Sequence, residues 1–206
     1  MKKQIAYTKD DINNLKALIE HFKTLLINYL NFYKEINKKP TKLISEYGEL
    51  LAQYKLLEEN FHISVLGGQS KADLVIIYEE NNKKDYIEVK TSTLKEEENG
   101  IGWGAALNKK DCNKHNEKDF CYFDYLIFIT LNEGFIPNFY IFTNKEIISH
   151  ESDLLNKSKH YKKSTNRIWI PIKPNPNNNF SRFELSLYKN QDFLERWDKI
   201  KSKNKI

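Results

Sequence analysis

The sequence has no apolar run near the roughly 20 residues that a membrane-spanning helix needs; its longest apolar stretch, around Tyr125–Leu131, has the length of a strand. The opening Met-Lys-Lys is not followed by an unbroken apolar segment, so we expect no secretory signal. Two cysteines, Cys112 and Cys121, are too few for a disulfide framework in 206 residues. These absences exclude integral membrane and disulfide-rich secreted classes and make the cytoplasm the expected compartment.

Arginine is also scarce, with only Arg167, Arg182 and Arg196, so the net charge of +5 comes almost entirely from lysine. This modest positive balance permits a phosphate-rich partner but does not require one. Hydrophobic residues make up 40% of the chain and charged residues 30%, which is enough apolar material for a core. We therefore expect one globular domain over residues 1–206.

The N-terminal segment has the pattern of a long helix. Thr8, Asp10 and Asp11 offer capping side chains. Apolar residues then follow at alternating steps of three and four, at Leu15, Leu18, Phe22, Leu25, Tyr29, Phe32 and Ile36, and the stripe is widened by Ile19, Leu26 and Tyr33. We expect this face to pack on the rest of the domain; pairing with a second copy of the helix is the alternative.

A second helix is expected from Thr41 to about Asn60, because Pro40 ends the first. Its predicted buried stripe consists of Leu43, Tyr47, Leu50, Tyr54 and Leu57. After it the sequence becomes rich in β-forming residues. The segments Asp73–Glu79 and Asp85–Thr91 flank Asn81-Asn82 and so predict a β-hairpin.

The remainder alternates between strand and helix patterns. We expect a helix over Ala105–Lys118, strands over Phe123–Leu131, Phe139–Thr143, Arg167–Ile172 and Phe183–Tyr188, a short helix capped by Asn144, and a final amphipathic helix. The order predicts an α/β fold in which a mixed β-sheet is flanked by helices. Within it we expect an N-terminal helical arm over 1–39, a core over 41–145 and a mixed C-terminal extension over 146–206.

The predicted hairpin carries charged residues of types that suit metal-dependent chemistry. Asp73 opens its first strand, and alternation puts Glu88 and Lys90 on one face of the second, with Ile87 and Val89 on the other. Charges on a central strand are costly to bury without partners or a metal. Two carboxylates and a backbone carbonyl suit Mg²⁺, whose bound water can attack a phosphodiester. The spacing alone also fits a hairpin whose Glu88 and Lys90 pair on a solvent face.

Ala72-Asp73, a 14-residue gap and Glu88-Val89-Lys90 resemble the signature of the PD-(D/E)xK nuclease superfamily, the fold of many type II restriction endonucleases. Ala72 replaces the nominal proline of that signature. The resemblance covers about residues 43–198 and implies a restriction-endonuclease-like fold. It also implies that Asp73, Glu88 and the carbonyl of Val89 hold Mg²⁺, with Mn²⁺ as a substitute, and that Lys90 serves the attacking water.

Further segments resemble accessory parts of that superfamily. Glu49, within Gly48–Ala52 on the second helix, resembles an auxiliary acidic residue that binds a second ion or orients the first; Glu46, one turn earlier, is the reserve for this role. Trp103 with Lys109-Lys110 resembles a W…(S)KK element. In this interpretation the residues that contact DNA are Thr91, Ser92, Thr93, Trp103, Lys109, Lys110 and Arg167; a core-covering Trp103 and solvated loops are the alternatives.

The resulting hypothesis is a Mg²⁺-dependent DNA endonuclease of restriction type or another defence against foreign DNA. Its expected partners are double-stranded DNA and a cognate methyltransferase. A second copy of the chain is also expected, since cutting a duplex needs two nicks. Two alternatives stay open: a nucleic-acid-binding or assembly module that no longer cuts, and a structure-specific repair or recombination nuclease.

Overall fold

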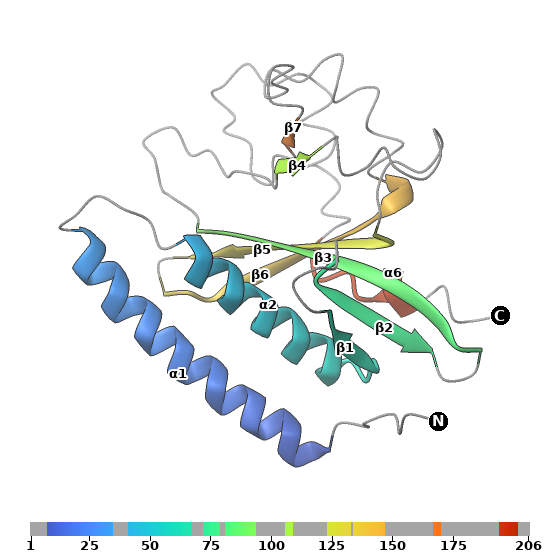
Figure 1. Cartoon of the computed structure of the whole chain (residues 1–206), viewed down its shortest axis with the longest axis horizontal. Helices are drawn as coiled ribbons and strands as arrows, with labels where there is room; N and C mark the ends of the chain where they lie inside the picture. The colour runs from blue at the N-terminus through green and yellow to red at the C-terminus, as the bar shows by residue number, and fades with distance from the viewer. Residues whose placement is uncertain are drawn as a thin grey trace. The chain divides into compact units, whose positions relative to one another are not determined.

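The computed structural model describes residues 8–34, 41–66, 72–78, 81–93, 106–108, 123–132, 134–146, 167–169 and 194–201, with the side chains of 30–34, 106–108, 167–169 and 201 outside the description. The predicted α/β fold, with a mixed sheet flanked by helices, is confirmed (Figure 1). Five strands form one sheet in the order β1-β2-β3-β5-β6, and β4 and β7 form a separate two-stranded sheet. In the described part of the chain, no helix is long and apolar enough to cross a membrane.

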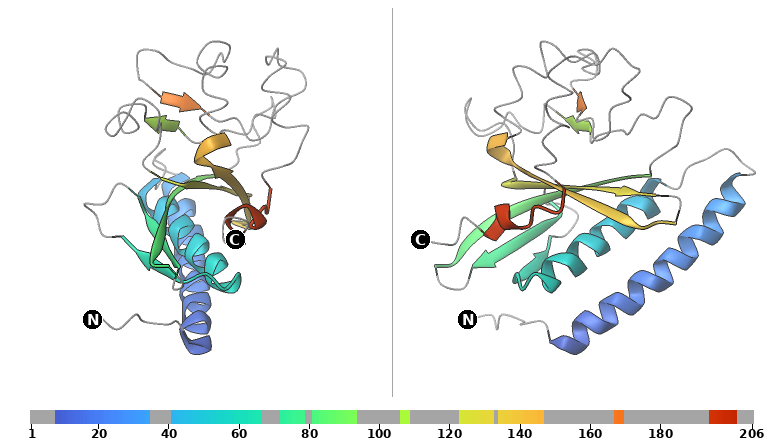
Figure 2. Two further views of the ribbon diagram at one scale, coloured as in Figure 1. Left: turned by 90° about the vertical axis from the view of Figure 1, so that its right-hand side faces the viewer. Right: turned by 180° about the vertical axis from the view of Figure 1, so that it is seen from behind.

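The chain divides into two compact units, Met1–Val89 and Lys90–Ile206. The first begins with α1 (Lys9–Lys34) and α2 (Thr41–Glu58), which run alongside each other in opposite directions (Figures 1 and 2). Thr8 caps α1 as predicted: its Oγ1 accepts a hydrogen bond from the N–H of Asp11, and its own N–H donates to the Asp11 carboxylate. Between the helices, the rings of Phe22 and Tyr47 stack with centroids 6.3 Å apart.

The packing faces of both helices differ from the predicted stripes. Among the side chains of α1 that the structure describes, the buried ones are Ile19 and Leu26, the residues expected only to widen the stripe, whereas Leu18 and Leu25 are exposed. On α2 the buried set is Ile44, Tyr47, Gly48, Leu51, Ala52, Leu56 and Leu57. Of the predicted α2 stripe, Tyr47 and Leu57 are therefore buried, and Leu43, Leu50 and Tyr54 are half-buried.

The first unit continues with an antiparallel ladder of strands. β1 (Ile63–Val65) pairs with β2 (Leu74–Tyr78), and β2 pairs with β3 (Lys83–Thr93) in the predicted hairpin. The turn is made at Asn82, whose φ of 53° lies in the left-handed region that Asn tolerates better than most residues. Near this turn the buried Asp85 accepts a hydrogen bond from the hydroxyl of Tyr78 at 3.0 Å and forms an ion pair with Lys83 at 3.8 Å.

The second unit has β5 (Tyr125–Leu131) and β6 (Pro137–Thr143) as its antiparallel centre, and all seven residues of β5 are buried. β4 (Ala106–Asn108) pairs with β7 (Arg167–Trp169). The helix predicted over Ala105–Lys118 is therefore wrong at residues 106–108, where cross-strand pairing overrides a weak helical pattern; its other residues lie outside the description.

The short helix after β6 is capped by Thr143 and not, as predicted, by Asn144. The N–H and hydroxyl of Thr143 donate to Glu146 Oε2 at 2.7 and 2.9 Å, and the N–H of Glu146 donates back to Thr143 Oγ1 at 3.2 Å. This reciprocal pair is a capping box. The side chain of Asn144 instead donates to the carbonyl of Phe123 at 2.8 Å.

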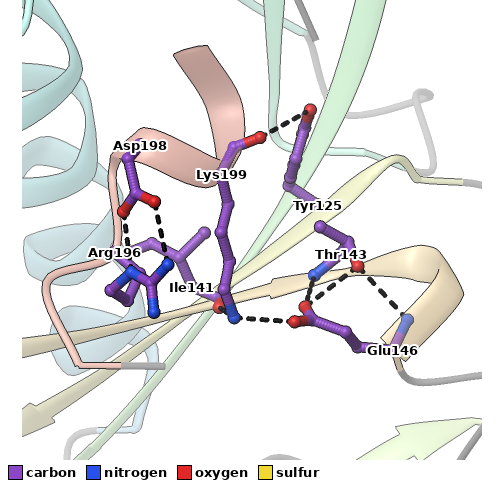
Figure 3. Close-up of polar contacts among 7 residues, drawn as sticks. All are labelled: Tyr125, Ile141, Thr143, Glu146, Arg196, Asp198 and Lys199. Atoms are coloured by element: carbon purple, nitrogen blue, oxygen red, sulfur yellow. Dashed lines mark hydrogen bonds and ion pairs between the residues drawn. The ribbon is translucent and has the colours of Figure 1, made fainter. Parts of the chain in front are cut away.

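Leu194 and Glu195 lie beside β6, and the chain then leads into α6 (Asp198–Lys201). Trp197 is buried, with its ring 5.4 Å from that of Phe139. Lys199 Nζ donates to the carbonyl of Ile141 at 3.3 Å and forms an ion pair with Glu146 Oε1 at 2.8 Å (Figure 3). The capping carboxylate of Glu146 therefore also holds the end of the described chain in place.

Candidate functional site

The register of the hairpin places Asp73 opposite Glu88. Leu74 is the Cα partner of Ile87, so the residue before Leu74 meets the residue after Ile87. Two hydrogen bonds fix Asp73 there. Its N–H donates to the carbonyl of Ile87 at 3.0 Å, and its carboxylate Oδ2 accepts from the N–H of Val89 at 2.7 Å. Asp73 is thus bonded to the residues on either side of Glu88.

Glu88 is buried although its neighbour toward the turn on the same face of β3 is exposed. Tyr86, two residues earlier on the same face, is 39% exposed, whereas Glu88 is 4% exposed. Ile87 and Val89 on the opposite face are core residues, as alternation predicts. Burying a carboxylate is costly unless it is compensated. The hypothesis of a solvent-facing Glu88 on an exposed hairpin is therefore wrong.

Lys90 follows on the Glu88 face of the same strand. Its Cα lies two strand positions beyond Glu88, about 7 Å along β3, and the residue is half-buried. Alternation therefore gives β3 an acidic and a basic side chain in succession on one face. The division between the two compact units falls just before Lys90.

The donor set at the hairpin fits a small hard cation. Mg²⁺ prefers oxygen ligands and is commonly held by one or two carboxylates while it keeps several waters. Asp73 uses Oδ2 in the bond to Val89, and a carboxylate can accept about four such bonds, so capacity is left on Asp73. In the part of the chain that is described, no group of three or more His, Cys, Asp or Glu side chains could hold a metal ion. The candidate centre therefore consists of two carboxylates and backbone oxygen.

The two auxiliary acidic candidates lie on α2. Glu46 forms an ion pair with Lys42 at 3.7 Å, and its side chain is 44% exposed. Glu46 therefore lies at the surface of α2. Glu49 is half-buried. Since no group of three acidic residues forms among the described side chains, Glu49 does not complete a cluster with Asp73 and Glu88.

The predicted DNA-contacting residues are partly described. Thr91, Ser92 and Thr93 are half-buried at the end of β3, with Thr91 Oγ1 buried and without a hydrogen bond. Arg167 begins β7, and its Cα partner in β4 is Asn108, the residue that precedes Lys109 in the sequence. Trp103, Lys109 and Lys110 lie outside the described residues.

Sequence reasoning missed two features of the hairpin. It did not foresee that the N–H of Val89 donates to the carboxylate of Asp73; the role assigned to the Val89 carbonyl stays a prediction. It also passed over Asp85, which is buried and satisfied by Tyr78 and Lys83. Asp85 shares its strand parity with Ile87 and Val89, so alternation alone could have placed it inward.

The chain was compared with protein-family models, curated proteins and solved structures. No protein-family model and no curated protein matches the chain. Among solved structures, the chain is similar to the bacterial homing endonuclease I-Ssp6803I, with 19% sequence identity over 81% of this chain and 96% of that one, at a TM-score of 0.47. A likeness this distant does not decide what the chain does.

Proposed function

We propose that the protein is a Mg²⁺-dependent DNA endonuclease that hydrolyses phosphodiester bonds, with Asp73, Glu88 and Lys90 as its catalytic set. The observation that carries this proposal is the pair of hydrogen bonds that hold Asp73 to the neighbours of the buried Glu88. Carboxylates that approach each other repel, and a divalent cation bound between them relieves this repulsion. The motif resemblance of Asp73 and Glu88-Val89-Lys90 to the PD-(D/E)xK signature supports the same assignment.

Each residue has a distinct role in this proposal. Asp73 and Glu88 hold the cation, together with the carbonyl of Val89. When bound there, the ion would supply a water of lowered pKa and would polarise the phosphate. Lys90 orients the water that attacks phosphorus and stabilises the charge that builds up on the phosphate oxygens. The new P–O bond would form from this water as the bond to the leaving oxygen breaks, and the leaving oxygen would take up a proton in exchange for the one that the water loses.

A plasmid-nicking assay tests the proposal directly. We expect supercoiled DNA to be cut with Mg²⁺ or Mn²⁺, and to stay intact with EDTA or with the Lys90→Ala variant. Lys84→Ala is the matched control, because Lys84 is an exposed lysine on the same strand but outside the motif. Absence of metal-dependent cutting on every DNA substrate, by a protein that binds DNA, would favour the binding module instead.

The biological setting of the proposed nuclease is a further hypothesis. Restriction or another defence against foreign DNA is the role that the motif resemblance favours, and it requires a methyltransferase or an equivalent means of protecting the host DNA. A structure-specific repair nuclease would share the chemistry and differ in substrate. Parallel assays on branched and linear duplexes separate the two, because a repair nuclease should prefer the branched substrate strongly.

A further inference from the structure

Tyr86 is the exposed neighbour of the buried Glu88 on one face of β3. Residues 86, 88 and 90 alternate onto this face, and Tyr86 precedes Glu88 on the side of the turn. Tyr86 is 39% exposed and Glu88 is 4% exposed, whereas Lys90 is half-buried. Of these three side chains, Tyr86 therefore offers the most surface to a molecule that approaches Glu88 from solvent.

The packing of the hairpin holds Tyr86 at this position. Its Cα partner in β2 is the buried Val75. The residues before and after it in β3, Asp85 and Ile87, are buried as well. A tyrosine has only two side-chain torsions, so one presented from a fixed strand can bond a ligand at a small cost in conformational entropy.

The distance between positions 86 and 88 suits neighbouring phosphates. Residues i and i+2 of a strand are about 7 Å apart, which is close to the separation of successive phosphates along one DNA strand. When the scissile phosphate lies at Glu88, as proposed above, the next phosphate therefore lies near Tyr86. Tyrosine hydroxyls are among the groups that bind phosphate oxygens in protein–DNA interfaces.

A hydroxyl also fits the charge of this site. A lysine or arginine at position 86 would attract the carboxylate of Glu88 and compete with a bound cation. A phenol donates a hydrogen bond to a phosphate oxygen and brings no positive charge. Tyr86 can therefore hold the substrate beside an acidic metal site without displacing the metal.

We propose that Tyr86 binds the substrate strand, with its hydroxyl donating a hydrogen bond to the phosphate next to the scissile one. This proposal rests on the proposed function, because the catalytic set defines which phosphate is scissile. The contact is the same for every base, so it positions the strand and does not select a sequence. It is made before and during cutting alike, so its loss raises KM and leaves kcat nearly unchanged.

Tyr86→Phe tests the contact, because it removes the hydroxyl and retains the ring. The probe is a short duplex that spans the strongest cut mapped on the plasmid. With Ca²⁺ in place of Mg²⁺, we expect its affinity for the variant to fall on the order of tenfold. The salt dependence of binding should stay the same, since no cationic group is lost. Tyr29→Phe is the matched control: Tyr29 lies on α1, is 37% exposed, and should leave binding and cutting unchanged.

A methylphosphonate, which replaces one charged phosphate oxygen by a methyl group, locates the contact. We place it one phosphate to either side of the scissile one and measure binding by wild type and Tyr86→Phe. On one side the loss of affinity should be smaller for the variant, because the hydroxyl that meets this phosphate is already gone. Equal losses on both sides in the two proteins would overturn the proposal.

Other outcomes separate this proposal from the nuclease itself. A Tyr86→Phe variant that binds and cuts like wild type, in a chain that does cut DNA, would overturn the contact and keep the nuclease. A lower melting temperature that accounts for the lost affinity would show that the hydroxyl serves the fold, and would also overturn the contact. A wild-type chain that binds DNA and never cuts it would overturn the nuclease, and with it the place assigned to Tyr86.

Discussion

The carboxylate of Asp73 accepts a hydrogen bond from the backbone N–H of Val89, with 2.7 Å between Oδ2 and N. Val89 directly follows the buried Glu88, so this bond also holds Asp73 beside the backbone of Glu88. Asp73 thus has a structural contribution, made through one lone pair, and a proposed chemical one, made through its charge. The two contributions can be separated by substitution.

Asp73→Asn and Asp73→Ala should differ in stability and agree in activity. An Asn side chain retains an oxygen that can accept from Val89, so we expect its free energy of unfolding to stay within about 1 kcal/mol of wild type. Ala leaves a partly buried N–H without its acceptor, which costs about 1–3 kcal/mol. Both variants should lose DNA cutting. Urea unfolding and plasmid nicking measure the two effects.

Asp10→Asn is the control for this pair, because Asp10 is exposed at the start of α1: it should leave DNA cutting unchanged and lower the free energy of unfolding by no more than about 1 kcal/mol, the usual worth of a carboxylate in the first turn of a helix. An Asp73→Asn variant that cuts DNA at the wild-type rate would contradict the role of the charge. Equal stability of the Asn and Ala variants would show that the bond to Val89 contributes little to the hairpin.

Mg²⁺ should stabilise the wild-type fold and leave Glu88→Gln unaffected. A ligand that binds only the folded state adds about 1.4 kcal/mol at a tenfold excess over its Kd. In Glu88→Gln the site has lost one of its two proposed charges, so this increment should vanish. In EDTA the variant should be as stable as wild type or more stable, since it no longer buries a carboxylate.

Thermal unfolding with and without Mg²⁺ measures this difference without any nuclease assay. Tyr86→Phe, two residues earlier on the same face, should respond to Mg²⁺ as wild type does. If Mg²⁺ raises the melting temperature of Glu88→Gln as much as that of wild type, the ion binds elsewhere on the chain.

The hairpin could be predicted from the sequence because local signals agreed with one another. β-forming segments on either side of Asn81-Asn82 fixed the turn, and the turn fixed the register between Leu74 and Ile87. Alternation then put Ile87 and Val89 in the core. The choice between a buried and a solvent-facing Glu88 could not be made from the sequence, because alternation gives a face and does not say what covers it.

The face of α1 could not be predicted because the helix has two adjacent apolar rows. Ile19 and Leu26 form one, and Leu18 and Leu25 the other, about 100° apart around the axis. The spacing of apolar residues does not distinguish the two rows. Which row is buried depends on the surface of α2 against which α1 packs. The strand at Ala106–Asn108 was missed for a related reason, since its partner β7 lies about 60 residues away in the sequence.

Tyr47 should make the first unit sensitive to alkaline pH. Burial of its phenol, and the nearby negative charge of Glu20, raise the pKa of Tyr47 from 10.0 to about 12. A pKa that is higher in the folded than in the unfolded state gives a contribution to stability that is complete below pH 10. This contribution is lost as the pH rises from 10 through 12. Tyr47→Phe retains the ring stacked on Phe22 but has no proton to lose.

The measurement is the difference in unfolding free energy between wild type and Tyr47→Phe as a function of pH. It should be constant up to about pH 10 and then shift in favour of the variant, by something on the order of 1–3 kcal/mol at pH 12. Parallel curves up to pH 12 would mean that the Tyr47 hydroxyl reaches solvent in the folded state.

Lys199 should contribute more to stability than its neighbour Arg196, although both form ion pairs. The side chain of Lys199 is 11% exposed and bonds both the carbonyl of Ile141 and the carboxylate of Glu146, which also caps the helix after β6 (Figure 3). Arg196 pairs with Asp198 at 2.8 Å, but the two side chains are 40% and 62% exposed. Lys199→Met should therefore cost about 1–3 kcal/mol, and Arg196→Met less than about 0.5 kcal/mol. The Lys199 effect should also persist at high salt, because a buried pair is poorly screened. Urea unfolding at two salt concentrations measures both variants, and an equal, salt-sensitive loss in the two would contradict the structural role of Lys199.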